Sequence, residues 1–236
     1  WYSENKRDLP WRHDNDPYRV WLSEIILQQT RVAYGESYFK TFTTTFPNVH
    51  LLAAASEEKV LKLWQGLGYY SRARNLHKTA ILVANSMDGI FPTTYKDLLA
   101  LPGVGPYTAA AISSICYHQP HAVVDGNVYR VLSRFFGIKT PIDQHQSKKQ
   151  FEILANDLLD ANQPENYNPA LMEFGAMQCT PKSPNCHQCI LNQSCVARQT
   201  NKVSDYPYKE KNIKIKKRYF NYIVPLLPNN KTALIQ

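Results

Sequence analysis

The sequence lacks the features that mark a membrane protein or a secreted protein. It has no apolar run long enough to span a bilayer, and no secretory signal opens it. It also has no internal repeat of solenoid period and no low-complexity tract. We therefore expect a cytoplasmic protein of bacterial type that does not bind membranes.

Cysteine is scarce, and its distribution is uneven. The chain has five cysteines, four of which form the late pattern C-x6-C-x2-C-x5-C. So few cysteines, crowded together, argue against a disulfide framework and favour a metal site in a reducing compartment. Structural zinc usually takes paired C-x2-C knuckles, and this loop has one. Ligand softness and spacing favour an iron–sulfur cluster and leave zinc as the rival.

Length and charge narrow the class of partner. The chain has 236 residues and a mass of 27.1 kDa, which is enough for one or two domains with a real core. Its formal net charge is +8 and its isoelectric point is about 9.2. Such a balance favours a polyanionic partner, although many basic proteins have none.

A glycine-containing turn lies near the middle of the chain, where residues 101–108 read LPGVGPYT. Gly103 and Gly105 allow a tight turn with exposed amides, and Pro106 suits the first turn of a following helix. Amides at a helix start attract phosphate without reading a base. A plain connection between two helices would have the same sequence.

Two acids stand in helical contexts with different physical consequences. Asp125 stands at an N-cap position before an apolar pattern that Gly137 ends, and the helix dipole should keep its carboxylate ionised. Glu24 shares a helix face with Val20 and Leu27, so apolar neighbours should raise its pKa. Such a pair can supply a proton donor and a cation stabiliser. The ordinary alternatives are a plain N-cap and an exposed or salt-bridged glutamate.

Other helix signals frame a second turn. Pro17 opens one helix, Ser56 caps a helix that should stop at Gly66, and Thr94 starts a short one. The stretch 66–75, GLGYYSRARN, combines tyrosines that could stack on bases with Arg72 and Arg74, which could bind phosphates. The alternative is a turn whose tyrosines pack on neighbours.

The C-terminal part changes in character. Residues 199–218 form a basic linker, and residues 219–236 alternate like the first hairpin of another, β-containing domain. The chain starts at Trp1, and the hairpin stops too soon to close a sheet. We therefore expect this sequence to be part of a longer protein.

Taken together, these motifs resemble the adenine DNA glycosylases of the MutY type, within the endonuclease III-like, helix-hairpin-helix superfamily. The resemblance runs from Trp1 to about Arg198 through LPWR, WLSE, LQQT, GLGYY, LPGVG, DGN and the cysteine loop. It implies an all-α domain over residues 1–198, with the hairpin at about 98–117 and a [4Fe-4S] loop at 179–195. The segment 219–236 would then begin a MutT-like domain.

The resemblance also implies roles for individual residues. Glu24 would protonate an adenine mispaired with 8-oxoguanine or guanine, and Asp125 would stabilise the sugar cation. Asn127 and Tyr107 would support them. The expected DNA contacts are Arg7, Trp11, Arg12 and Leu27 around the flipped adenine, Gln29 and Tyr69 as wedges, and Gln28, Thr30, Gly103, Val104 and Gly105. The expected cluster ligands are Cys179, Cys186, Cys189 and Cys195.

The implied enzyme is a monomer that binds double-stranded DNA and hydrolyses the N-glycosidic bond without cutting the backbone. In the related bifunctional endonuclease III-like enzymes, which remove oxidised pyrimidines, a lysine stands where Tyr107 stands here. A non-catalytic iron–sulfur DNA-binding module and a zinc-stabilised helical adaptor are further alternatives. The cysteine loop is far in sequence from both acids, which favours a structural or DNA-orienting role for it.

Overall fold

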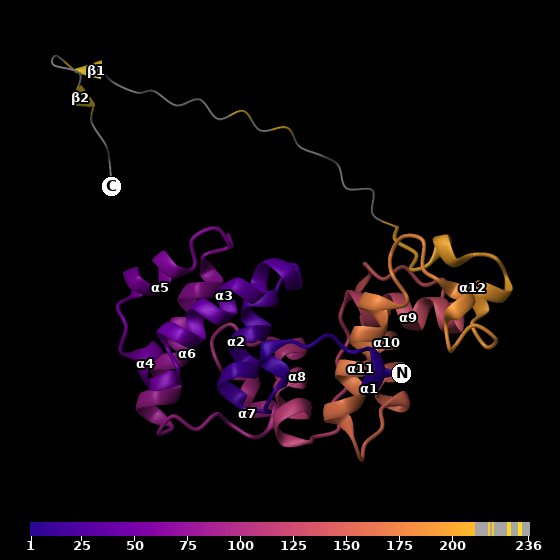
Figure 1. The fold of residues 1–236 in the computed structure, drawn as a ribbon, viewed down its shortest axis with the longest axis horizontal. Helices are drawn as coiled ribbons and strands as arrows, with labels where there is room; N and C mark the ends of the chain where they lie inside the picture. The colour runs from indigo at the N-terminus through magenta and orange to yellow at the C-terminus, as the bar shows by residue number, and fades with distance from the viewer. Residues whose placement is uncertain (211–216, 218, 220–225, 228–230, 233–236) are drawn as a thin grey trace.

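The structure, a computed structural model, describes residues 1–210, 217, 219, 226–227 and 231–232 (Figure 1). In this part the chain is predominantly helical, so the all-α prediction for the first domain is confirmed. The helices are α1 (Tyr2–Asn5), α2 (Pro17–Leu27), α3 (Val32–Thr45), α4 (Val49–Ala53), α5 (Glu57–Leu63), α6 (Ser71–Ser86), α7 (Tyr95–Leu99), α8 (Pro106–Tyr117), α9 (Gly126–Phe136), α10 (His145–Leu158), α11 (Pro164–Met177) and α12 (Val196–Gln199). Short 3-10 turns lie at Pro10–Arg12, Cys186–Gln188 and Val203–Asp205.

The helices form two lobes. Figure 1 shows α2 to α8 in the first lobe and α9 to α12 in the second, with α1 lying on the second lobe beside α11. The Trp1 ring meets the Phe174 ring edge-on, with centroids 5.0 Å apart, and this contact helps to hold α1 there. The chain then crosses to the first lobe to begin α2, so residues 6–16 run between the lobes.

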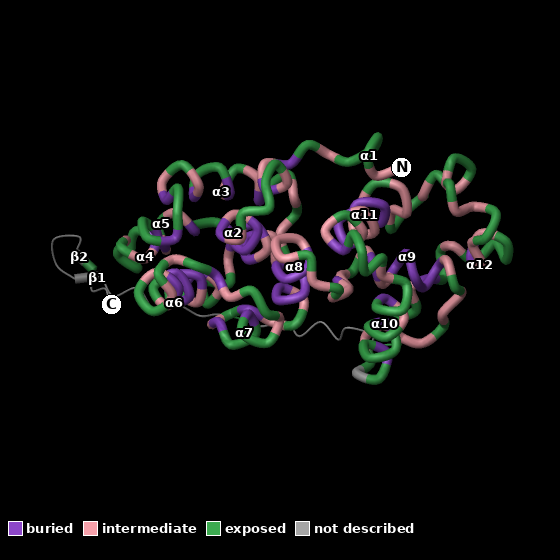
Figure 2. The backbone as a smooth tube through the Cα atoms, turned by 90° about the horizontal axis from the view of Figure 1, so that it is seen from below, coloured by how far each residue is buried: buried purple, intermediate pink, exposed green. Residues whose placement is uncertain are grey.

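Each lobe has an apolar core of its own. Figure 2 shows the buried parts of α2, α6 and α8 in one lobe and of α9 and α11 in the other. The first core contains the fully buried rings of Trp21, Trp64 and Phe42, among many others. The second is smaller and centres on Val128 and Phe151. Burial of aromatic and aliphatic side chains on helix faces therefore accounts for both lobes.

Helix α8 connects the two lobes. It contacts α2 and α7 in the first lobe and α11 in the second. Ala110 and Ala111 lie on α8 in a small buried cluster with Val123. Because alanine side chains are short, they allow neighbouring backbones to approach closely. The start of α8 and the start of α9 are thereby held near the same inter-lobe space.

The predicted helix starts are observed, and one predicted helix end is wrong. The side chains of Asp16, Ser56 and Thr94 each cap the first turn of a helix, and Gly137 ends α9 with φ +66°. The helix after Ser56, however, ends at Leu63 and not at Gly66. The reason is Trp64, whose buried ring donates from Nε1 to the Gly68 carbonyl (3.0 Å) and so fixes a turn in place of a further helical turn.

Among the described residues, no helix is long and apolar enough to cross a membrane. Near the C-terminus, strands β1 (Leu226–Leu227) and β2 (Lys231–Thr232) pair antiparallel, with Leu226 opposite Thr232. Apart from Tyr219, the rest of the predicted hairpin lies outside the described residues. The same is true of Lys211, Lys214, Lys216 and Arg218 in the predicted basic linker.

We predict that Phe151→Ala lowers the free energy of unfolding by about 3–5 kcal/mol, because it leaves a cavity in the small second core. The Phe151 side chain is fully buried and meets the Tyr129 ring edge-on at 4.9 Å. Ile153→Ala on the same helix is the control, because Ile153 is 53% exposed and its loss should change stability by about 0.5 kcal/mol or less. Denaturant titration measures both, and equal losses would contradict the two-core description.

Candidate functional site

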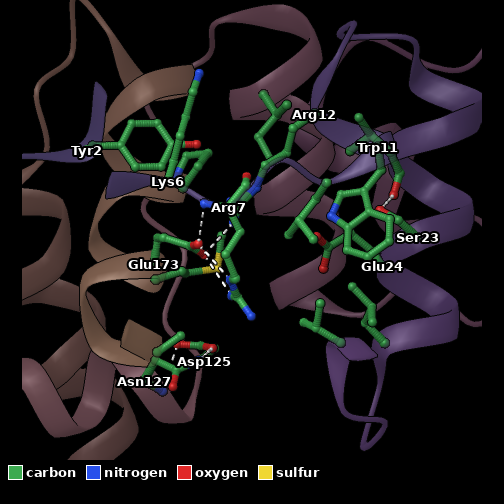
Figure 3. Close-up of a pocket in the computed structure, with 18 of the residues that line it drawn as sticks. Tyr2, Lys6, Arg7, Trp11, Arg12, Ser23, Glu24, Asp125, Asn127 and Glu173 are labelled. Carbon is green, nitrogen blue, oxygen red and sulfur yellow. Dashed lines mark hydrogen bonds and ion pairs between the residues drawn. The ribbon is translucent and has the colours of Figure 1, made fainter. Parts of the chain in front are cut away.

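A cavity of about 770 Å³ lies between the two lobes. This volume is within the range of pockets that bury a small organic molecule. Figure 3 shows Glu24 on one wall and Asp125 with Asn127 on the other, with Arg7 reaching between them. The predicted site residues that line the cavity are Arg7, Trp11, Arg12, Glu24, Leu27, Thr30, Tyr107, Asp125 and Asn127.

Glu24 projects from α2 into this cavity. Its side chain is half-buried and lines the cavity wall, which withdraws the carboxyl from bulk water. This burial raises the pKa of Glu24 to about 7, against the lowering effect of a hydrogen bond with Tyr107; the Asp125 charge raises it further. This direction agrees with the raised pKa predicted from the sequence. A carboxyl of this kind holds a proton near neutral pH.

Asp125 caps the start of α9. Its Oδ1 accepts from the backbone N–H groups of Asn127 and Val128, both at 2.8 Å, and its Oδ2 accepts from Asn127 Nδ2 at 2.6 Å. The predicted N-cap geometry is thus present. Burial raises the pKa of Asp125 above its ordinary value, against the lowering effect of these hydrogen bonds, and the ionised state expected from the helix start stays a prediction. Withdrawal from water at the cavity wall outweighs the helix start.

Tyr107 lies in the first turn of α8, close to both acids. Burial raises its pKa well above the ordinary value, and the charges of Glu24 and Asp125 raise it further. Its hydroxyl is a hydrogen-bond partner of Glu24 and also lies 3.5 Å from Met172 Sδ. The phenol therefore stays protonated beside the two carboxyl groups and acts as a donor.

Glu173 is a cavity residue that sequence reasoning missed. It lies on α11 and is 1% exposed. Arg7 donates to it from Nε (2.7 Å), Nη2 (2.8 Å) and the backbone N–H (2.9 Å), and Arg12 donates from Nη2 (2.8 Å). Burial alone would raise the pKa of Glu173, but the bonds from Arg7 and then Arg12 hold it at about 2. The available signal was an acid among Leu171, Met172 and Phe174, the same signal that identified Glu24.

Two buried arginines on α9, Arg130 and Arg134, were not predicted, because the apolar pattern that indicates this helix does not include them. Arg130 donates to Asn127 Oδ1 (2.9 Å) and to the Cys179 carbonyl (2.7 Å). Arg134 donates to the Thr180 carbonyl (2.7 Å) and lies 3.4 Å from Cys179 Sγ. Hydrogen bonds therefore connect the Asp125 cap to the first cysteine of the late loop, which the distance in sequence did not suggest.

The four late cysteines are free thiols, each partly buried. Burial raises the pKa of Cys186 and of Cys189, and the charges of the neighbouring cysteines raise it further. Among the described residues, no three His, Cys, Asp or Glu side chains converge on a point that would hold one metal ion. Four soft thiol donors around one loop are the ligand set that a [4Fe-4S] cluster takes.

The expected duplex contacts lie outside the cavity, apart from Thr30. Gln29 and Tyr69 are non-glycine residues with positive φ (58° and 46°) at exposed turns. Gln28 reaches inward, with its Nε2 3.5 Å from Thr108 Oγ1. Arg72 differs from its expectation as a phosphate contact, because its guanidinium bonds to carbonyl groups inside the protein. Arg74 lies on the surface as an ion pair with Glu57 (3.3 Å).

The hairpin turn agrees with prediction in its glycines and departs from it at Val104. Gly103 has φ +77°, and a Cβ there would lie 2.8 Å from Asn75 Cβ, so the turn requires glycine. Gly105 caps α8, and Pro106 is its first residue, as predicted. The Val104 side chain is buried and its amide donates to the Leu101 carbonyl (3.1 Å). Val104 therefore stabilises the turn itself, and its amide is not free for a phosphate.

The fold and the cysteine loop define a class, that of endonuclease III-like helical proteins. A solved structure titled as a thermostable thymine-DNA glycosylase superposes with a TM-score of 0.76 at 30% identity, covering 84% of this chain and 92% of that one. A trapped endonuclease III–DNA covalent intermediate shares the fold at a TM-score of 0.71, 23% identity and coverage of 85% and 91%. Residues 179–195 match the iron-sulfur binding domain of endonuclease III, so this loop binds a [4Fe-4S] cluster.

Residues 22–156 match the family model described as HhH-GPD superfamily base excision DNA repair protein. The chain belongs to this superfamily. Similar curated proteins are the adenine DNA glycosylases of Buchnera aphidicola subsp. Schizaphis graminum (38% identical over 212 residues, 89% of this chain and 61% of the relative) and of Homo sapiens (45% over 208 residues, 84% and 38%). The chain thus spans about two fifths to three fifths of the length of these relatives.

We predict that purified protein carries about four iron atoms and four sulfides per chain, the content of one [4Fe-4S] cluster. Cys186→Ser should lose most of this load, because it removes one of four thiolate ligands. Cys116→Ser is the matched control: Cys116 is a free thiol on α8, outside the loop. Iron and acid-labile sulfide assays on anaerobically prepared protein measure both. Stoichiometric zinc without sulfide would contradict the assignment.

Proposed function

We propose that this protein is a monomeric, monofunctional DNA glycosylase that releases adenine mispaired with 8-oxoguanine or guanine in double-stranded DNA. The observation that carries the proposal is a proton-holding Glu24, with a pKa of about 7, in one cavity with the capped carboxylate of Asp125. The curated relatives named adenine DNA glycosylase support the choice of base.

The reaction begins with extrusion of the adenine from the duplex into the cavity, because a stacked base is out of reach of both acids. Glu24 then donates its proton to a ring nitrogen of the base. The bond between that protonated base and the sugar C1′ breaks, and its electron pair leaves with the adenine. Protonation is needed because neutral adenine is a poor leaving group.

Asp125 acts on the sugar. As the glycosidic bond breaks, positive charge develops on C1′ and the ring oxygen, and an adjacent carboxylate lowers the barrier by electrostatic attraction. The bonds from Asn127 and Val128 keep the Asp125 carboxylate oriented and oppose its protonation. Water then adds to C1′, and its proton passes to the Glu24 carboxylate, which restores the acid. Tyr107 holds the Glu24 carboxyl by hydrogen bonding.

The remaining cavity residues would bind the base. Trp11 and Leu27 supply apolar surface, while Arg7 and Arg12 supply N–H donors at the cavity wall. Glu173 keeps both guanidinium groups in place through its four hydrogen bonds. On the duplex, the proposed contacts are Gln28, Gln29, Thr30 and Tyr69 near the extruded base and the turn at Gly103 and Gly105 on the backbone. None of these last contacts requires a particular sequence of bases.

Thymine release is the second candidate, since the similar thymine-DNA glycosylase structure is matched over 92% of its length at 30% identity. A bifunctional reaction is a third, because backbone cleavage proceeds through a covalent amine–sugar intermediate. Tyr107, whose phenol cannot form a Schiff base, stands at the position where the bifunctional relatives carry their lysine, which weighs against that reaction.

We predict release of adenine from duplexes with A opposite 8-oxoguanine and A opposite G, and none of thymine from T opposite G or of thymine glycol. Base release under single-turnover conditions measures this outcome. Borohydride added with the substrate should trap little protein on DNA, since no amine attacks the sugar. Thymine release without adenine release would favour the second candidate. Efficient trapping would move the chain to the bifunctional enzymes.

We predict that adenine excision depends on pH through Glu24. A raised carboxyl pKa of about 7 means that the proton donor is present below pH 7 and is lost above it. The single-turnover rate should therefore fall about tenfold per pH unit above about pH 7. Glu24→Gln should lower the rate about 100- to 10,000-fold and remove this alkaline limb, with DNA binding retained. An unchanged profile in Glu24→Gln would overturn the assigned role.

A further inference from the structure

Two residues on separate turns adopt a backbone conformation that is unusual for their type. Gln29, just after α2, has φ +58°, and Tyr69, just before α6, has φ +46°. Both are exposed, and the Tyr69 side chain is 68% exposed. Residues other than glycine disfavour this region, and they stay there when the surrounding structure holds them. The surroundings of these two turns therefore contain the restraint.

One side chain, Arg72 on α6, restrains both turns. Its Nη1 lies within hydrogen-bond distance of the carbonyl oxygens of Ile25 (3.1 Å), Ile26 (3.2 Å) and Gln28 (2.5 Å) at the end of α2. Its Nη2 reaches the Leu67 carbonyl (3.1 Å) and the Gly68 carbonyl (3.4 Å) of the second turn. A cation at these carbonyls also suits the negative end of α2. Arg72 thus links the backbone preceding Gln29 to the backbone preceding Tyr69.

Aromatic contacts complete the link. The Arg72 guanidinium lies 5.1 Å from the Trp64 ring centroid and 5.9 Å from that of Tyr69. Trp64 is fully buried and donates to the Gly68 carbonyl (3.0 Å). The innermost of the three groups, the Trp64 ring, is therefore fixed in the core. On the α3 side, Tyr38 donates from its hydroxyl to the Gln65 carbonyl (2.8 Å). The exposed Tyr69 ring is therefore supported by fixed groups.

We propose that Arg72 is a positioning residue that holds Gln29 and Tyr69 as one rigid, two-pronged wedge for extruding a base from duplex DNA. The proposal rests on the proposed function, since it names the residue on which the extrusion step depends. A wedge separates stacked bases only if its side chains stay in place when the bases press on them. Without the hydrogen bonds from Arg72, Gln29 and Tyr69 would relax from positive φ toward ordinary backbone angles. Arg72 acts from inside the protein and uses its donors on carbonyl groups, so its contribution is not phosphate binding.

The test compares Arg72→Lys with Arg74→Lys. Each change keeps the positive charge at its own position on α6. A lysine ammonium, however, lacks the planar guanidinium whose N–H groups reach both turns. Arg74 is the matched control, because its side chain lies on the surface with Glu57. The first measurement uses 2-aminopurine in place of the target adenine, in a Glu24→Gln background that leaves the base attached. Its fluorescence rises when the base leaves the stack.

We expect Arg72→Lys to bind the duplex and to lose most of the fluorescence rise, while Arg74→Lys keeps it. With Glu24 restored, Arg72→Lys should excise adenine from a full duplex at least about tenfold more slowly, the scale of a positioning defect. Its rate on adenine in a single-nucleotide bulge, which is already unpaired, should be unchanged. An undiminished fluorescence rise, or equal slowing on duplex and bulge, would overturn the proposal.

A double-mutant cycle of Arg72→Lys and Tyr69→Ser distinguishes a loss of wedge positioning from a general loss of stability. If Arg72 acts through the wedge, Tyr69→Ser should slow duplex excision in the unmodified background and add little in the Arg72→Lys background. Fully additive effects would overturn the proposal. The fluorescence comparison requires no base release, so it tests Arg72 separately from the function. If the unmodified protein released adenine from no mispair, this result would contradict the proposed function and not the proposed role of Arg72.

Discussion

The half-buried carboxylate at the start of α9 is the constraint around which the rest of the site is arranged. Asp125 accepts three hydrogen bonds from the turn that it caps, and burial still raises its pKa. The residues around the Asp125 carboxylate are therefore closely packed. A Cβ at Gly175 would lie 2.7 Å from Asn127 Cβ, so glycine alone lets α11 approach the cap this closely. Arg130 then extends the network from Asn127 to the cysteine loop.

Three acids at one cavity have different environments, and the differences explain how they can do different work. For Glu24, burial outweighs the lowering effects of the Tyr107 hydrogen bond and of the Arg12 charge, so it keeps a proton near neutral pH. Asp125 has N–H donors on both oxygens. Glu173 has two arginines and stays ionised down to a pKa of about 2. A proton donor, a cation stabiliser and a structural anion thus share one space because burial penalises all three charges, while their partners compensate them unequally.

The predictions that held were those whose physical cause is local. N-caps at Ser56, Thr94 and Asp125 and the stop at Gly137 depend on a few adjacent residues, and each is observed. The grouping of Glu24, Tyr107 and Asp125 at one cavity was anticipated through family resemblance, since no periodicity relates residues on three helices. The end of α5 was missed because the Trp64 ring packs in the core and bonds to Gly68, which local propensity does not report.

The sequence by itself determined the N-caps at Ser56, Thr94 and Asp125, the end of α9 at Gly137 and the four thiols of the cluster loop, because each depends on neighbours along the chain. Tertiary structure alone decided the partners of charged groups. It brought Glu173 to Arg7 and Arg12 across 161 to 166 positions, linked the Asp125 cap to Cys179, and turned Arg72 inward. It also set the direction in which the pKa of Asp125 moves, since the desolvation of a carboxylate depends on everything packed around it.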